Sequence, residues 1–325
     1  MGAGQYQIVD KPLSPGESSD TYGVPLGSTI YQLDNGVTKV YGPDNKHLLS
    51  AKDADSNTIF TPNGPSKATH VHHVPRGSYI ETIGNITKVY KSLNDKTCIL
   101  TVVNQNKGRS NSLPPDSNPT YWIEWAGDGN IDDFGWTRAE WDCPSEPPSP
   151  SGNVINHIFN GITDDEDIIQ PVLSWNYGGS DSWTGRAWYG VDGEYFPDED
   201  PVTDISEGDD IWGVMYRSSN VWYVYFINQT TVETSWIASY NHPDADDLVF
   251  QVVLEGPNVL DDDDVCGDIE FHDMVFKDDS NDDIEGIELI PNINPYYDIR
   301  LSNLDVDCDQ SAPIDNSWAT LYTDN

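Results

Sequence analysis

The sequence predicts an all-β fold, with a small N-terminal β-repeat domain followed by a two-sheet antiparallel β-sandwich. Three features of the chain lead to this prediction. Short runs rich in β-branched and aromatic residues recur throughout, clusters of Gly, Pro, Asn, Asp and Ser separate them, and no stretch shows the 3.6-residue periodicity of a capped helix. Many short strands without helices are typical of sandwiches and barrels.

Charge divides the chain at about residue 110. Residues 1–110 contain nine Lys and two Arg against nine acidic side chains, a balance of +2, whereas the remaining residues carry −41. All 11 Trp also follow residue 120. The Ser-, Asn- and Pro-rich segment 107–119 predicts a linker. We therefore expect a Lys-rich domain over residues 1–106 and an acidic sandwich over residues 120–325.

The net charge of −39 and the pI near 4.1 disfavour two classes of partner. Nucleic-acid phosphates and anionic membrane surfaces would repel such a polyanion. No apolar run approaches the roughly 18 to 20 residues that span a bilayer, and no N-terminal stretch resembles a signal peptide. Because 37% of the residues are hydrophobic, the acidity does not indicate disorder. We expect no nucleic-acid partner and no membrane partner.

The N-terminal part contains an internal repeat. Residues 24–41 (VPLGSTIYQLDNGVTKVY) and 74–90 (VPRGSYIETIGNITKVY) each predict a strand, an Asn-Gly or Gly-Asn turn, and a second strand ending in Thr-Lys-Val-Tyr. Asn-Gly between alternating apolar residues indicates a tight hairpin, because its turn needs positive φ at both central residues. One more short strand follows each copy. The sequence thus predicts two similar three-stranded units, at about 24–50 and 74–103.

Three histidines lie between the two copies, in the run His70-Val71-His72-His73. On a strand, His70 and His72 would share a face, which is compatible with metal binding, but no third ligand is identifiable. The pattern favours an ordinary polar strand face. We expect no metal site and no cofactor.

The acidic part predicts ten short strands, rich in aromatic and β-branched residues and bounded by turn-forming residues. Their order without helices predicts the sandwich. The expected strands are residues 121–125, 137–142, 154–159, 168–175, 187–191, 210–216, 222–228, 233–238, 248–255 and 269–276.

Two of these strands carry polar residues opposite their apolar face. In residues 168–175 the alternation leaves Gln170 on the non-core face, and in residues 248–255 it leaves Gln251 and Glu255 there. A Gln and a Glu on that face could meet in one groove, although alternation alone favours simple solvent exposure. Pro171 lacks a ladder N–H and predicts an edge position or a bulge.

The segment from Tyr121 to Phe276 resembles the glutamic peptidases, or eqolisins. DDEDIIQPVLSW resembles the strand that presents their catalytic Gln, and LVFQVVLEGPNV with IEFHDMVF resembles the pair that carries their catalytic Glu. Gln170 and Glu255 fall on these positions. Four further runs resemble family segments in the same order, namely WIEWAGDGNIDDFGWTRAEWDCPSEPPSP, TGRAWYGVDGEYF, DISEGDDIWGVMY and VWYVYFINQTT.

The resemblance implies a concanavalin A-like jelly roll with the dyad on its concave face, and an acid-acting endopeptidase with a polypeptide substrate. Glu255 would act as general base on a water molecule, and Gln170 would orient this water and donate to the developing oxyanion. The expected substrate-binding residues are Trp175, Trp188, Tyr189 and Gln251. The family is usually extracellular, whereas this sequence shows no signal peptide.

The acidic run Asp261–Asp264 follows Glu255 closely in the sequence. Nearby like charges raise a carboxyl pKa, so we expect an ordinary or modestly raised pKa for Glu255 and an acidic pH optimum. Glutamic peptidases resemble this chain in having a Lys-rich N-terminal segment that restrains an acidic enzyme. The hypothesis is an intramolecular contact in which residues 1–110 dock on the acidic sandwich at neutral pH and loosen as its carboxylates become protonated.

A non-catalytic carbohydrate-binding protein with a glycan partner is the alternative, because the same sandwich occurs in lectins. Aromatic side chains could stack on sugar rings, although aromatics in sandwich strands more often belong to the core. The tryptophans concerned are Trp175, Trp183, Trp188, Trp212, Trp222 and Trp236.

The four cysteines, Cys98, Cys143, Cys266 and Cys308, form no closely spaced motif. They allow three full disulfide pairings or free thiols, and Cys143 with Cys266 is the pair to test first. Near the C-terminus, Asp305, Asp307 and Asp309 alternate on an expected strand, and the sequence around them favours a solvated face over a calcium loop.

Overall fold

The computed structural model describes residues 5–9, 21–53, 58–105, 121–131, 134–150, 152–164, 167–240, 248–284, 287–298, 300–302, 304–308 and 317–323. The fold is all-β, as predicted, and α1 (Pro295–Asp298) is the one α-helix within these ranges. No helix in this part of the chain is long and apolar enough to cross a membrane. The expected linker 107–119 lies outside the described residues, so the division into two domains stays a prediction.

The first sheet of the sandwich has eight antiparallel strands in the order β17-β16-β15-β14-β22-β12-β24, with β18 also paired to β16. It positions the candidate site described below. Its strands are β12 (Trp122–Ile131), β14 (Asn156–Thr163), β15 (Asp167–Trp175), β16 (Trp183–Val191), β17 (Glu194–Pro197), β18 (Val202–Ile205), β22 (Leu248–Glu255) and β24 (Ile290–Ile293).

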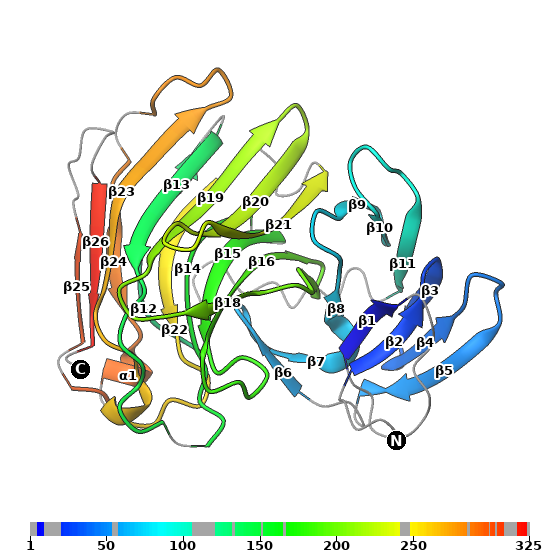
Figure 1. Cartoon of the computed structure of the whole chain (residues 1–325), viewed down its shortest axis with the longest axis horizontal. Helices are drawn as coiled ribbons and strands as arrows, with labels where there is room; N and C mark the ends of the chain where they lie inside the picture. Colours follow the sequence, from blue (N-terminus) through cyan, green and yellow to red (C-terminus); the bar gives the residue numbers. More distant parts are fainter. Residues whose placement is uncertain are drawn as a thin grey trace.

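The second sheet faces the first across the hydrophobic core (Figure 1). Its sandwich strands run in the order β25-β26-β23-β13-β19-β20-β21 and are antiparallel. With these two sheets, all ten strands expected in the acidic part are present. The strands are β13 (Phe134–Asp142), β19 (Asp210–Ser218), β20 (Val221–Asn228), β21 (Glu233–Tyr240), β23 (Ile269–Asp278), β25 (Asp305–Cys308) and β26 (Ser317–Tyr322).

The N-terminal repeat extends this second sheet to thirteen strands. Each copy is a three-stranded antiparallel unit, as the repeat predicts. The units join through a parallel β11–β3 pair, and β9 adds in parallel to the sandwich edge strand β21. The blue and cyan strands in Figure 1 show this extension. They are β3 (Ser28–Leu33), β4 (Val37–Tyr41), β5 (His47–Lys52), β9 (Tyr79–Ile83), β10 (Ile86–Tyr90) and β11 (Cys98–Asn104).

The chain has several smaller elements besides these sheets. β1 (Gln5–Val9), β2 (Thr21–Pro25) and β8 (His72–His73) form a parallel three-stranded sheet. β6 (Thr58–Thr61) and β7 (Gly64–Lys67) form a separate hairpin, which extends from the N-terminal strands toward the sandwich in Figure 1. Short 3-10 turns occur at η2 (Ala68–His70) and η3 (Asp262–Asp264).

Alternation along the strands builds the core between the two sheets. On β22, Phe250 and Leu254 enter this core, and on β15, Ile169 and Leu173 do so. Each such buried side chain contributes about 1.5 to 3 kcal/mol by leaving water. Several large aromatic residues of the sandwich are buried in the same core, namely Trp141, Trp175, Trp183, Trp222 and Tyr189.

The four cysteines are free thiols, three of them buried. Burial raises the pKa of Cys143, and the neighbouring Cys266 raises it further, so these two lie close together without a bond. On β25, Asp305 and Asp307 face solvent, in alternation with the buried Val306 and Cys308.

Candidate active site

The outer face of the first sheet, turned away from the sandwich core, carries its own hydrophobic cluster. We call this face of β12, β14, β15, β16 and β22 the site face. Ile59 of the β6–β7 hairpin packs against the cluster, so the hairpin covers the site face. The buried members of the cluster are Val71, Trp122, Phe159, Val172, Tyr177, Trp188 and Val253.

Glu255 ends β22 on the site face, where it pairs with Trp122 of β12 and His157 of β14. Its side chain is fully buried. Oε1 accepts a hydrogen bond of 3.0 Å from the backbone N–H of Gly64, and Oε2 has no hydrogen-bond partner among the described residues. Burial raises the pKa of Glu255 to about 8, while the Gly64 N–H and the Trp122 side chain oppose the increase. The acidic run Asp261–Asp264 is therefore not the cause, and the pKa increase is larger than the modest one expected from sequence.

Gln170 lies on β15, also on the site face and 1% exposed. Its Nε2 donates a hydrogen bond of 3.4 Å to the carbonyl of Pro62, and its Oε1 has no partner in the described part of the chain. The edge position expected from Pro171 is wrong, because β15 is paired on both sides, by β14 and β16. Pro171 is tolerated since its ring points to the core, where Gly213 leaves room: a Cβ on Gly213 would lie 2.8 Å from the ring.

The strand order separates Gln170 from Glu255. β14 lies between their two strands, and His157 pairs with Glu255 on one side and with Ser174 on the other. Gln170 is four residues from Ser174 along β15, about 13 Å. No hydrogen bond joins these two described side chains. What they share is the turn Pro62–Gly64, which Gln170 contacts at the carbonyl of Pro62 and Glu255 at the N–H of Gly64.

His157 and Ser174 occupy the row of Glu255 and were not identified from the sequence. Nδ1 of His157 lies 2.8 Å from Oγ of Ser174. Burial lowers the pKa of His157 to about 3, against the opposing effect of the Phe60 backbone, so the imidazole is neutral. Alternation along Asn156–Thr163 places His157 on the same face as Phe159. This pattern was the available sequence signal for His157.

The β6–β7 hairpin has a tight turn that only glycine fits. Gly64 has a φ of +88°, and a Cβ there would lie 3.0 Å from Cδ2 of Tyr121. The Thr61 hydroxyl donates to the carbonyl of Gly64 at 2.8 Å, and Phe60 packs edge-on against Tyr121 at 6.3 Å. The dipeptide Asn63-Gly64 between two short strands is the sequence signal for this hairpin, which was not predicted above.

The four expected substrate-binding residues separate into two groups. Trp188 and Gln251 are buried on the site face. Trp188 packs edge-on against Tyr177 at 5.5 Å, and Nε2 of Gln251 has no hydrogen-bond partner within the described ranges. Trp175 and Tyr189 belong to the core between the sheets. A ligand on the site face could therefore reach only the first two.

A second contact between the N-terminal strands and the sandwich surrounds Glu194 of β17. Nδ1 of His70 lies 2.8 Å from Oε1 of the buried carboxylate, and Nε2 of His72 lies 2.7 Å from Oε2. Asn104 adds a longer contact of 3.5 Å. The polar strand face expected for the histidines is wrong, because His72 and His73 are buried and His70 lies in η2 rather than on a strand.

Arg76 makes the remaining ion pair between the two parts of the described chain. Its Nε lies 3.3 Å from the buried Asp198, and its Nη2 donates to the carbonyl of Asp200 at 2.7 Å. Among the described residues, no ion pair across this contact uses a lysine. The contact is made by histidines, by one arginine and by the pairing of β9 with the edge strand β21. The charge balance had suggested lysines instead.

Comparison with solved structures finds similarity over part of the chain. A scytalido-glutamic peptidase bound to a transition-state analogue has a TM-score of 0.40 and 20% identity, covering 63% of this chain and all of that one. SCP-B, a member of the eqolisin family solved with the tripeptide Ala-Ile-His, has a TM-score of 0.39 and 19% identity, with the same coverage. Tailspike protein 2 of bacteriophage CBA120 has a TM-score of 0.29 and 12% identity over 49% of this chain and 24% of that one.

No family model and no curated protein sequence matches the chain. The resemblance to glutamic peptidases expected over a segment is thus confirmed as a similarity to solved structures at about one fifth identity.

Proposed function

We propose that this chain is a glutamic-type peptide-bond hydrolase whose site is closed by its own β6–β7 hairpin. One observation carries the proposal: a backbone N–H and a backbone carbonyl of the turn Pro62–Gly64 are hydrogen-bonded to Glu255 and to Gln170. These are the groups that any polypeptide substrate would offer at the same places. The site face therefore has the donors and acceptors that bind an extended peptide.

The proposed chemistry assigns a role to each side chain. Glu255, once ionised and hydrated, acts as general base on a water molecule that attacks the peptide carbonyl, and then returns the proton to the leaving amine. Gln170 donates its amide N–H to a backbone carbonyl of the substrate, as it does to Pro62 in the closed form. Because four residues of strand, about 13 Å, separate it from the row of Glu255, this role is substrate binding along the site face.

The closed form is inactive for two physical reasons. Glu255 is fully buried and its pKa of about 8 keeps the carboxyl protonated through acid and neutral pH, so it cannot accept a proton from water. Its Oε1 is also occupied by the Gly64 N–H. Catalysis therefore requires the hairpin to leave the site face.

A glycan-binding function is not favoured. Stacking on sugars needs exposed aromatic faces. Trp175, Trp183 and Trp222 lie in the core between the sheets, and Trp188 belongs to the hydrophobic cluster of the site face that the hairpin covers. The burial of these four residues removes most of the aromatic set on which that alternative depended.

Displacing the hairpin is expected to create peptidase activity that depends on Glu255. The opened variant carries Ile59→Asp and Gly64→Ala, which put a charge into the hydrophobic cluster and a side chain into the space beside Tyr121. Casein digestion at a pH of roughly 2 to 5, chosen from ordinary carboxyl pKa values, should be faster in the opened variant than in the unmodified protein. Adding Glu255→Gln should reduce that rate by at least about 100-fold, and adding Gln170→Ala should reduce it by a smaller factor, roughly tenfold, through weaker substrate binding.

The matched control variant carries Leu48→Asp and Gly84→Ala. Leu48 is exposed, and Gly84 also has a positive φ but open space where a Cβ would stand. This variant should behave as the unmodified protein does. Digestion that persists after Glu255→Gln in the opened variant, or an opened variant that is folded and inactive from acid to neutral pH, would overturn the proposed function.

A further inference from the structure

A β-bulge in β23 turns two consecutive polar side chains to the outer face of the thirteen-stranded sheet. In the ladders with β13 and with β26, three residues of β23 span the length of two residues of the neighbour. Asp273 at the bulge has a φ of +47°. As a result, Phe271 and Met274 both enter the core while His272 and Asp273 both lie on the opposite side. Bulges of this kind re-aim side chains.

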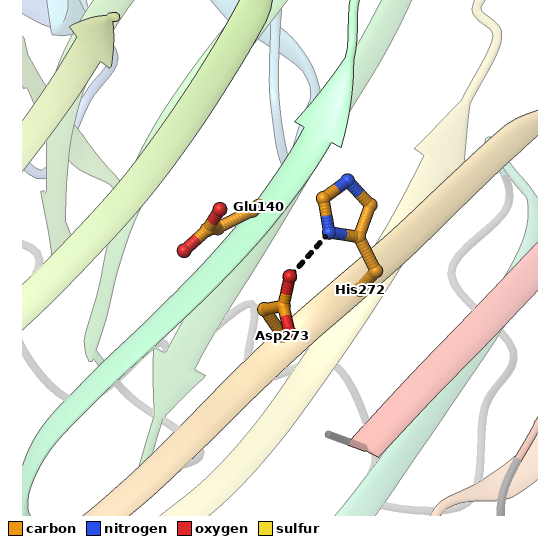
Figure 2. A group of neighbouring side chains, drawn as sticks. All are labelled: Glu140, His272 and Asp273. Carbon is orange, nitrogen blue, oxygen red and sulfur yellow. Dashed lines mark hydrogen bonds and ion pairs between the residues drawn. The ribbon is translucent and has the colours of Figure 1, made fainter. Parts of the chain in front are cut away.

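The bulge places His272 and Asp273 beside Glu140 of β13, the residue that pairs with His272. Each of the three side chains offers one ligand atom, and these atoms all lie within 4.8 Å of one another. Figure 2 shows the three side chains next to one another on neighbouring strands, with the contact between His272 and Asp273 marked. Nδ1 of His272 lies 3.1 Å from Oδ2 of Asp273.

The cluster is open to solvent on one side. The Glu140 side chain is 12% exposed, whereas those of His272 and Asp273 are 36% and 51% exposed. An ion could therefore enter without rearranging the sheet and could keep water as a further ligand.

Negative charge exceeds positive charge around this space. Besides Asp273, the carboxylate of Asp210 lies near enough to act electrostatically on Glu140, so a third carboxylate adjoins this space. Arg138 is the one guanidinium acting on Glu140, at 2.7 Å from its Oε1, and it also lies over the Trp212 ring at 4.6 Å. Three carboxylates against one guanidinium leave an excess that a cation would neutralise.

We propose that Glu140, His272 and Asp273 bind a divalent transition-metal ion, for which zinc is the best match. Zinc accepts imidazole nitrogen together with carboxylate oxygen, usually with four ligands, so that three protein ligands leave one position for water. Calcium and magnesium take oxygen ligands only and would leave the imidazole unused. The ion would replace the His272 to Asp273 contact and tie β23 to β13 across the bulge.

Calorimetric titration of the full chain with zinc, in a large excess of magnesium, tests the site. Magnesium occupies the general acidic surface, so one remaining zinc site is expected. His272→Ala, Asp273→Asn and Glu140→Gln should each weaken zinc binding by at least about tenfold. Arg138→Gln should tighten it, because the guanidinium competes for Glu140. Cobalt should give a visible absorption band that is lost in His272→Ala.

The control is His47→Ala, which removes another exposed histidine far from β23 in the chain, bonded to Ser50. It should bind zinc as the unmodified protein does. The proposal is overturned if the unmodified protein shows no zinc site in the presence of magnesium, or if folded His272→Ala and Asp273→Asn variants both bind zinc with unchanged affinity.

Discussion

Replacement of Glu194 by Ala is expected to lower the free energy of unfolding by about 3 to 5 kcal/mol, because it leaves buried charge without a partner. The carboxylate bridges two imidazoles that come from the N-terminal strands, at 2.8 Å from His70 and 2.7 Å from His72. Burial acts to raise the pKa of Glu194, but the two histidines hold it near 2. Burial likewise acts to lower the pKa of His70, and Glu194 raises it above its ordinary value.

Urea unfolding of the two proteins at about pH 6, between the ordinary carboxyl and imidazole pKa values, measures this difference. Glu233→Ala is the control, since Glu233 is an exposed residue of β21, and its effect should stay within about 0.5 kcal/mol. A loss from Glu194→Ala no larger than that of the control would contradict a central role for this contact.

The stabilisation by the Glu194 contact is expected to be largest in mild acid. A depressed carboxyl pKa contributes stability above the ordinary value of 4.5 and loses it as the pH falls toward 2. A raised imidazole pKa contributes stability below the ordinary value of 6.5 and loses it as the pH rises through the folded value. The two conditions overlap between pH 4.5 and 6.5.

Glu255→Gln is expected to stabilise the closed protein at neutral pH, by about 3 kcal/mol at pH 7. The folded pKa of about 8 lies above the ordinary 4.5, so the folded state binds a proton that the unfolded state releases in this range. Unfolding is therefore increasingly favoured as the pH rises from 4.5 to 8. A glutamine is neutral throughout and can still accept from the Gly64 N–H, so it avoids this cost.

The measurement is the free energy of unfolding of both proteins by urea at several pH values. The difference should be small below pH 4.5, grow up to about pH 8, and then level off. The control is Glu288→Gln, which changes an exposed carboxylate. Its effect on the free energy of unfolding should not follow the pH dependence expected for Glu255→Gln. A difference between the unmodified protein and Glu255→Gln that does not vary with pH would contradict the buried, protonated carboxyl.

The contacts at Glu255 and at Glu194 are both expected to hold the N-terminal part against the sandwich in mild acid. This expectation is the opposite of the hypothesis drawn from the charge balance. That hypothesis expected the N-terminal part to loosen as carboxylates become protonated. At Glu255, protonation accompanies closure, and at Glu194 the paired state persists to well below neutral pH. We therefore expect mild acid alone to leave the hairpin in place, and displacement or cleavage of the hairpin to be the step that opens the site.

Local pattern was sufficient to predict much of the fold. The strand Leu248–Glu255 has the bounds expected from sequence, since a period of two over eight residues leaves little freedom. The same alternation puts Gln170, Gln251 and Glu255 on the non-core face, where the structure has them. The three-stranded units followed from the repeat and its turn residues.

What local pattern could not supply is the order and register of strands distant in sequence. Whether Gln170 shares a row with Glu255 depends on β14 lying between β15 and β22, which no single strand encodes. The burial of Glu255 depends on Gly64, 191 residues away along the chain. The size of its pKa increase follows from this burial, which the neighbouring run Asp261–Asp264 does not indicate.

The central claim is that the β6–β7 hairpin seals Glu255 beneath it, and a carbon-13 NMR titration of the Glu255 carboxyl tests this most directly. Comparison with Glu255→Gln assigns the resonance. The pKa should be about 8 in the unmodified protein and in Leu48→Asp/Gly84→Ala, and should fall toward 4.5 in Ile59→Asp/Gly64→Ala. An ordinary pKa in the unmodified protein, or an unchanged raised value in the folded opened variant, would contradict the claim.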